Sequence, residues 1–291
     1  MTAPRRTLVG ELSAEFAGTM ILILFGVGVV AQVVTSEGTL GDHDSIAWCW
    51  GLGVMLGIYT AARISGAHLN PAVTLALAVF RGFEWNKVLP FALAQTLGAF
   101  VAALLVRWTY SDAIAGVDPD HTMATQGIFS TLPGNGALDV TFSTALLDQV
   151  MGTAILLFLV MAITDVRNNA PVAWFAPLAV GLVVVAIGMA WGTNAGYAIN
   201  PARDFGPRLV SFITGYDTAF EAPNGNLYFW IPIVGPLVGG LLGAGAYKLL
   251  VERFLPREDE SQEIGEIPAS DPASHPASHP ASHPASAGHR A

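Results

Sequence analysis

The sequence predicts an all-α membrane protein in which six helices cross the bilayer and two half-length helices enter it without crossing. Three observations predict this class: a scarcity of charged residues, six long apolar stretches, and two short apolar stretches that each begin with Asn-Pro-Ala. Hydrophobic residues make up 53% of the 291 residues and charged residues only 12%, about half the share usual in soluble domains. The chain therefore lacks the polar surface that a soluble protein of its size needs, and we expect lipid to surround it.

Charge and cysteine content exclude several other classes. The formal net charge of −9 offers no basic patch, so no nucleic-acid partner is expected. Cys49 is the single cysteine, which excludes an intrachain disulfide and a cysteine-rich metal cluster. Nothing in the sequence indicates a cofactor or a metal ion. The first apolar stretch is too long for the apolar core of a signal peptide and lacks a small-residue cleavage site.

Six apolar stretches are long enough to span a bilayer, which takes about 20 predominantly apolar residues. They carry few or no charges and cover residues 8–34, 45–63, 88–107, 145–164, 173–191 and 228–251. Two more apolar stretches, 71–80 and 201–213, reach only about half that length, and we expect them to form re-entrant half-helices.

Basic residues gather on one side of these spans. They precede the first span, separate spans two and three and spans four and five, and end the sixth: Arg5, Arg6, Arg63, Arg81, Lys87, Arg167, Lys248, Arg253 and Arg257. The opposite connections, 35–44 and 108–144, contain acidic residues but no lysine or arginine. The positive-inside rule therefore predicts that both termini are cytoplasmic.

The spans form an inverted 3+3 repeat, with a first repeat over about 8–108 and a second over about 145–251. Two motifs recur at equivalent places in the halves: Glu15-Phe-Ala-Gly-Thr19 with Gln149-Val-Met-Gly-Thr153, and Asn70-Pro71-Ala72 with Asn200-Pro201-Ala202. Because each half contains three spans, the second half must insert upside down relative to the first. Such repeats place the functional site at their interface, near the bilayer midplane.

The two ends of the chain differ from this core of residues 8–255. Residues 1–7 are expected to be a short cytoplasmic segment. After residue 255 the chain becomes a Pro-Ala-Ser repeat with His275, His279 and His283 at the variable position. Such a tract cannot bury apolar surface, so 256–291 is expected to be a disordered cytoplasmic tail rather than a weak metal site.

Asn-Pro-Ala is suited to begin a helix inside the membrane. Proline at the first helical position loses no hydrogen bond, because that N–H would be unpaired, and asparagine before it caps the helix through its side-chain oxygen. The amide NH₂ is then free to act as a donor. One such motif is an ordinary helix start, whereas two that open half-spans predict a pore with donors and positive helix ends near the midplane.

Longer motifs around these asparagines resemble one family. Ser65-Gly-Ala-His-Leu-Asn-Pro-Ala-Val-Thr74 and Gly196-Tyr-Ala-Ile-Asn-Pro-Ala-Arg-Asp-Phe-Gly-Pro-Arg208 are similar to stretches of the aquaporin superfamily and, within it, of the glycerol facilitators. The resemblance covers about residues 8–255, which would form the channel domain. It implies passive diffusion of glycerol and other small uncharged solutes, with some water, and exclusion of ions and protons.

The resemblance also implies a selectivity filter on the extracellular side of the two asparagines, formed by Trp50, Gly188, Tyr197 and Arg203. Arginine within a membrane is costly and usually functional, and its forked donors suit two neighbouring hydroxyls while its charge repels cations. Trp50 would supply an apolar wall, and Gly188 leaves space where water-selective relatives carry histidine. Tyr197 departs from the phenylalanine common in bacterial glycerol facilitators, so its hydroxyl either narrows the pore or adds a polar contact.

Other residues are expected to line or support the pore. The resemblance places His68 in the cytoplasmic vestibule. Glu15 should brace a re-entrant loop by bonding backbone groups that would otherwise be unpaired, and Asp204 should brace loops or pair with a cation. Gln149 stands where the family usually has a second glutamate, so that bracing should be weaker unless Asp148 compensates.

Other functions fit the sequence less well. A water-selective channel of the same fold would be expected to carry histidine in place of Gly188. An intramembrane enzyme would need an activated nucleophile and base, which no spacing indicates, and a structural or adhesion protein would not need Arg203 at pore depth. Coupled transport would need the paired acidic residues of a proton relay, whereas Glu15 and Asp148 are isolated within the spans.

The resemblance further implies a homotetramer with one pore per subunit, surrounded by lipid, with glycerol, water and small polyols as permeants. Short connections and the lack of a targeting sequence favour a bacterial inner membrane.

Overall fold

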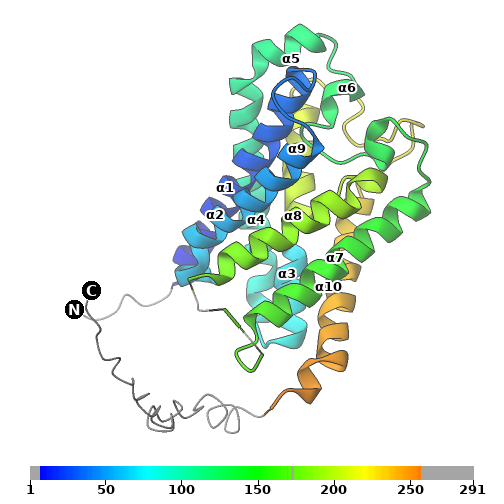
Figure 1. The fold of residues 1–291 in the computed structure, drawn as a ribbon. Helices are drawn as coiled ribbons and strands as arrows, with labels where there is room; N and C mark the ends of the chain where they lie inside the picture. Colours follow the sequence, from blue (N-terminus) through cyan, green and yellow to red (C-terminus); the bar gives the residue numbers. More distant parts are fainter. Residues whose placement is uncertain (1–6, 169, 172–173, 257–291) are drawn as a thin grey trace, which may run out of the picture. The chain divides into compact units, whose positions relative to one another are not determined.

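The computed structural model describes residues 7–168, 170–171 and 174–256, and this part of the chain is helical (Figure 1). Six helices are long and apolar enough to cross a membrane: α1 (Leu8–Thr35), α2 (His43–Ser65), α4 (Trp85–Thr109), α7 (Phe142–Thr164), α8 (Ala176–Ala195) and α10 (Ile231–Leu250). Apart from one isolated bridge between Glu221 and Leu227, the described residues form no strand pairing. The predicted all-α membrane fold is confirmed.

Two half-length helices, α3 (Pro71–Phe80) and α9 (Pro201–Ile213), occupy the predicted ranges. Short helices in the connections were not predicted: α5 (Ser111–Val117), α6 (Met123–Gln126), and the 3₁₀ turns η1 (Pro133–Gly136) and η2 (Glu252–Phe254). Helix α8 extends past its predicted end at residue 191, because the chain continues helically beyond a kink at Trp191 (φ −122°, ψ 21°). The N-terminal segment before Thr7 and the tail after Pro256 lie outside the described residues.

The two halves pack in matching ways. Helix α1 packs against α2 and α4, as α7 packs against α8 and α10. Helix α3 lies against α10, and α9 lies against α4, so each half-helix contacts the third span of the opposite half. Figure 1 shows α3 beside α10. Contacts between α2 and α8 also join the halves, and this is the pairing that an inverted 3+3 repeat requires.

Glycines allow these helices to approach closely, as small residues commonly do in membrane proteins. A Cβ at Gly57 on α2 would lie 2.6 Å from the carbonyl oxygen of Gly18 on α1, and a Cβ at Gly18 would lie 2.9 Å from that of Gly57. On α10, a Cβ at Gly239 would collide with the carbonyl oxygen of Val150 on α7. Larger residues at these positions would push the helices apart.

A charged network joins the ends of α3, α7 and α10. Asp165, just after α7, is 5% exposed and accepts hydrogen bonds from Arg167 Nη2 at 2.9 Å and from Tyr247 Oη at 3.1 Å. Glu252 pairs with Arg81 at 3.0 Å and with Arg167 at 3.1 Å. Burial by itself raises the pKa of Asp165, but the hydrogen bonds from Arg167 and Tyr247 outweigh it and hold this pKa at about 2.

Asp165→Asn is expected to lower the thermal unfolding temperature at pH 7 by a few degrees, since about 1 kcal/mol moves it by roughly 2 to 4 °C at this chain length. The pKa of Asp165 is lower in the folded state than its usual 3.8. Its contribution is therefore present above pH 4 and is lost as the pH falls toward 2. Melting curves of wild type and variant in detergent should differ at pH 7 and converge near pH 2. An equal difference at both pH values would contradict this assignment, and exposed Asp139→Asn is the control.

Candidate functional site

Left-handed residues turn the chain back into the bundle in two re-entrant loops. In the first loop, Gly66 (φ 93°), Ala67 (φ 54°) and Leu69 (φ 52°) carry the chain from α2 to α3. In the second, Gly196 (φ 66°), Tyr197 (φ 36°) and Ile199 (φ 44°) carry it from α8 to α9. Such backbone costs free energy for residues other than glycine and persists only where surrounding contacts fix it. Residues 66–70 and 197–200 all line one cavity.

Glu15 on α1 holds the first loop. Its Oε1 accepts from the His68 backbone N–H at 2.9 Å and from Ser65 Oγ at 2.6 Å. Its Oε2 accepts from the Leu69 backbone N–H at 2.7 Å and from Gln95 Nε2 at 2.8 Å. Four donors thus surround a carboxylate that is fully buried, and bonds to a charged acceptor are the stronger kind.

Gln149 occupies the equivalent place in the second half and bonds differently. Its Oε1 accepts from the Ile199 backbone N–H at 3.0 Å, and its Nε2 donates to the Ala195 carbonyl at 2.8 Å. Asp148 instead accepts a 3.1 Å bond from the side chain of Asn194. The amide therefore uses both its acceptor and its donor, while Asp148 bonds the end of α8 rather than the loop backbone.

Exchanging these two side-chain types should destabilise the protein in both positions. Gln149→Glu removes the donor to Ala195 and places a carboxylate oxygen against a carbonyl oxygen, while Glu15→Gln turns an NH₂ toward groups that are already donors. An unsatisfied buried polar group costs about 1 to 3 kcal/mol, so both variants should unfold at lower temperature in detergent. A Gln149→Glu variant as stable as wild type would show that the Ala195 bond contributes nothing.

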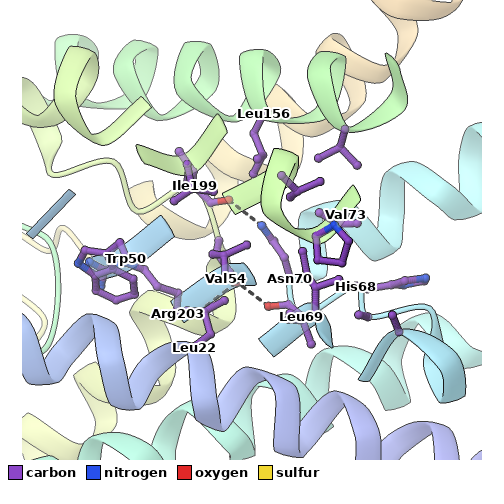
Figure 2. Close-up of a pocket in the computed structure, with 18 of the residues that line it drawn as sticks. Leu22, Trp50, Val54, His68, Leu69, Asn70, Val73, Leu156, Ile199 and Arg203 are labelled. Carbon is purple, nitrogen blue, oxygen red and sulfur yellow. Dashed lines mark hydrogen bonds between the residues drawn. The ribbon is translucent and has the colours of Figure 1, made fainter. Parts of the chain in front are cut away.

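The two asparagines bond each other's loops where the two half-helices begin. Asn70 Oδ1 accepts from the Ala72 N–H at 2.9 Å. Its Nδ2 donates to the Ile199 carbonyl at 2.8 Å, as Figure 2 shows. Asn200 Oδ1 accepts from the Ala202 N–H at 3.0 Å and its Nδ2 donates to the Leu69 carbonyl at 2.8 Å. An amide NH₂ has two hydrogens, so each asparagine keeps one for the cavity that both line.

The remaining motif residues shape these helix starts. Pro71 and Pro201 are the first residues of α3 and α9, where no intrahelical N–H bond is lost. Ala72 and Ala202 are buried and supply the capped N–H groups. The positive ends of both half-helices therefore point at the same region of the cavity.

Three side chains separate two cavities within the bundle. The larger cavity, about 420 Å³, is lined by both asparagines and by His68. The smaller cavity, about 280 Å³, lies toward the connections that precede α2 and α7. Trp50, Tyr197 and Arg203 line both cavities, so the two cavities adjoin at these three residues, and a solute that moves from one to the other has to pass them.

Arg203 and Tyr197 bring unpaired polar atoms to this passage. The guanidinium carbon of Arg203 lies 3.9 Å from the centroid of the Trp50 ring, a cation–π contact, and Figure 2 shows the two side chains together. Arg203 Nη1 and Tyr197 Oη are buried, and neither has a hydrogen-bond partner within the described part of the chain. Buried polar atoms are rarely left without a partner, so both are available to a solute in the passage.

Gly188 lies behind Tyr197 rather than on a cavity wall. A Cβ at Gly188 would lie 3.0 Å from Tyr197 Cζ and 3.0 Å from the Cβ of Ala47. The absence of a side chain at Gly188 was expected to leave space in the pore, but the Tyr197 ring occupies this space. Gly188 therefore matters because it allows the Tyr197 ring to pack closely against α8.

His68 lines the larger cavity, which it reaches from the first re-entrant loop. Its Nδ1 lies 3.1 Å from Thr74 Oγ1, and its ring packs against Phe83 and Phe91 with centroids 4.7 and 5.2 Å away. These contacts fix the ring, and only 9% of the residue is exposed.

A family model described as major intrinsic protein matches residues 3–247. The chain belongs to the major intrinsic protein family. The chain is 41% identical to a glycerol uptake facilitator protein of Escherichia coli over 86% of this chain and 91% of the relative. It is 42% identical to a protein of that name from Pseudomonas aeruginosa, over 87% and 93%.

Other members of the family are similar in sequence or structure. Aquaglyceroporin-2 of Rhizophagus irregularis is 44% identical over 83% of this chain and 77% of its own length. The X-ray structure of the aquaglyceroporin from Plasmodium falciparum superposes with a TM-score of 0.76 at 31% identity, covering 84% of this chain and 97% of that one. Major intrinsic proteins are channels and not enzymes, which excludes the enzyme alternative.

In this major intrinsic protein, Asp204 lies behind the passage and holds a connection in place. Its Oδ2 accepts from the Thr131 backbone N–H at 2.8 Å and from Thr131 Oγ1 at 2.7 Å, and its Oδ1 accepts from Arg208 Nε at 2.8 Å. Arg208 is fully buried and also donates to the carbonyls of Thr131 and Ala219. Arg208 belongs to the second Asn-Pro-Ala stretch, but no role was predicted for it or for Thr131. The spacing of Asp204 and Arg208 by four residues on a half-helix was the available signal.

Proposed function

We propose that this major intrinsic protein is a passive channel for glycerol and other small uncharged solutes, with some water, and that it excludes ions and protons. The observation that carries the proposal is the passage between the two cavities, bounded by Trp50, Tyr197 and Arg203. Trp50 and Tyr197 bring aromatic rings to this passage, and Arg203 Nη1 and Tyr197 Oη bring polar atoms that have no partner within the described part of the chain. A small molecule that carries both carbon and hydroxyl groups can contact both kinds of group.

The solute exchanges hydrogen bonds with water for hydrogen bonds with the protein. At the selectivity filter, which Trp50, Tyr197 and Arg203 line and Gly188 supports from behind Tyr197, Arg203 donates to neighbouring hydroxyls while the Trp50 ring covers the carbon chain. At the two Asn-Pro-Ala motifs, the free amide hydrogens of Asn70 and Asn200 donate to the same solute. Glycerol, small polyols and water carry oxygen acceptors for all these donors.

Cations are excluded electrostatically. The charge of Arg203 and the positive ends of α3 and α9 oppose a cation in the passage. Among the described residues that line the two cavities, none is acidic. A cation would therefore lose its hydration shell without meeting a compensating carboxylate.

We also propose an assembly and a location, which the sequence pattern and the family support. The channel forms a homotetramer with one pore per subunit, embedded in the lipid of a bacterial inner membrane, with both termini cytoplasmic. The basic residues that end α2, α3 and α10 support this orientation. In it, the larger cavity faces the cytoplasm and the smaller one faces the exterior.

Stopped-flow light scattering from liposomes containing the purified channel tests the proposal. Under a glycerol gradient, liposomes should shrink and then re-swell faster than empty ones, whereas under a sucrose gradient they should shrink without re-swelling. Rapid shrinkage without accelerated re-swelling in glycerol would favour a water-selective channel, in which Tyr197 closes the filter to polyols.

A further inference from the structure

His43, the first residue of α2, lies beside the passage on the side of the smaller cavity. It lines that cavity together with Trp50, Tyr197 and Arg203. The sequence did not indicate a role for His43, because this residue lies outside the Asn-Pro-Ala stretches, seven residues before Trp50 and among acidic residues.

The ring of His43 contacts both Gly188 and Tyr197. Its Nε2 lies 2.9 Å from the carbonyl oxygen of Gly188, and since a carbonyl only accepts, Nε2 carries the hydrogen and donates. The ring also meets Tyr197 edge to face, with centroids 6.4 Å apart and planes at 88°. A Cβ at Gly192 would collide with the ring, so this glycine, one turn after Gly188, gives the histidine its place.

The last turns of α8 need such support from outside. The kink at Trp191 interrupts the helix, and side chains from other segments bond the carbonyls on either side of it. His43 bonds that of Gly188, and Asn135 Nδ2 donates to that of Gly192 at 3.0 Å. Tyr197 follows two residues after the end of α8, and its ring rests on Gly188.

We propose that His43 is a positioning residue that fixes the outer rim of the filter and thereby limits the size of the polyol that passes. It holds the surface on which the Tyr197 ring rests, through Gly188, and it also abuts the ring itself. Without this support, Tyr197 can tilt toward the smaller cavity and the rim widens. This inference rests on the proposed function, because it assumes that polyols pass between Trp50, Tyr197 and Arg203.

The test compares wild type with His43→Ala and His43→Gln in liposomes, using glycerol, the four-carbon polyol erythritol and the five-carbon polyol xylitol. Re-swelling rates give the permeability of each polyol, and shrinkage in sucrose gives that of water. In His43→Ala the ratio of xylitol to glycerol permeability should rise about five-fold, equal to about 1 kcal/mol in the relative barrier. His43→Gln retains a side-chain N–H for the Gly188 carbonyl and should restore most of the wild-type ratio. Exposed Asp44→Ala, the neighbouring position on α2, is the matched control.

The outcomes separate this inference from the proposed function. If wild type does not conduct glycerol, the proposed function fails. If wild type conducts glycerol and His43→Ala has an unchanged polyol ratio, the positioning role is overturned. It is also overturned if His43→Gln changes the ratio as much as His43→Ala, since the bond to Gly188 would then be irrelevant. Water permeability retained in both variants shows that they have folded.

Discussion

Replacing Arg203 by alanine is expected to make the channel leak cations. The guanidinium lies in the passage between the two cavities, 3.9 Å from the Trp50 ring. Two unit charges about 5 Å apart repel by about 3 kcal/mol at an effective dielectric constant of about 20, so removing one should raise cation permeability about 100-fold. Sodium or proton entry into liposomes, followed with an internal fluorescent dye, measures this change directly.

Arg203→Lys separates the effect of charge from that of shape. Lysine keeps the positive charge but not the planar fork, so this variant should still exclude cations while conducting glycerol more slowly than wild type. If Arg203→Ala liposomes admitted no more cations than wild-type liposomes, the barrier would lie elsewhere, with the helix ends at Asn70 and Asn200 as its remaining source.

Gly188→His is expected to reduce glycerol permeability more than ten-fold while water permeability falls much less. Even a Cβ at this position would lie 3.0 Å from Tyr197 Cζ and from the Cβ of Ala47. An imidazole must therefore push the Tyr197 ring into the passage. A forced repacking of this kind costs about 1 to 3 kcal/mol, which is enough to close the passage to a polyol before it closes it to water. Stopped-flow traces in glycerol and in sucrose give both permeabilities.

Two alanine variants provide the matched comparison. Gly188→Ala adds only the crowded methyl group and should reduce glycerol permeability to a smaller extent. Gly28→Ala adds a methyl group on α1 where nothing lies within 4 Å, and its permeabilities should equal those of wild type. Unchanged glycerol permeability in Gly188→His would mean that Tyr197 does not bound the solute path.

The sequence predicted most of the fold because the signals are local. Span length and charge depletion locate the six long helices. The half-helices α3 and α9 begin where predicted because Asn70 and Asn200 cap them through their side chains and proline follows each cap. Among the residues that the sequence motifs singled out, Trp50, His68, Tyr197, Arg203 and both asparagines line the cavities, whereas Gly188 lines neither of them.

The supporting contacts were less predictable because they join distant parts of the chain. The bond between His43 and the Gly188 carbonyl spans 145 residues, and that between Thr131 and Asp204 spans 73. Neither the short helices of the 108–144 connection nor the kink at Trp191 leaves a clear periodic signal. Gln149 shows the same limit in another way: its type indicated weaker bracing, but not that its amide would donate to Ala195.

Glycerol and proton flux measured together in the same liposomes test the central claim most directly. Liposomes that contain the purified channel and an internal pH dye are mixed with a glycerol solution of different pH, which creates a glycerol gradient and a pH gradient in the same experiment. Our account predicts re-swelling faster than in empty liposomes while the internal pH changes no faster than in empty ones. Re-swelling at the rate of empty liposomes, or collapse of the pH gradient alongside glycerol entry, would contradict a channel that passes polyols and excludes charge.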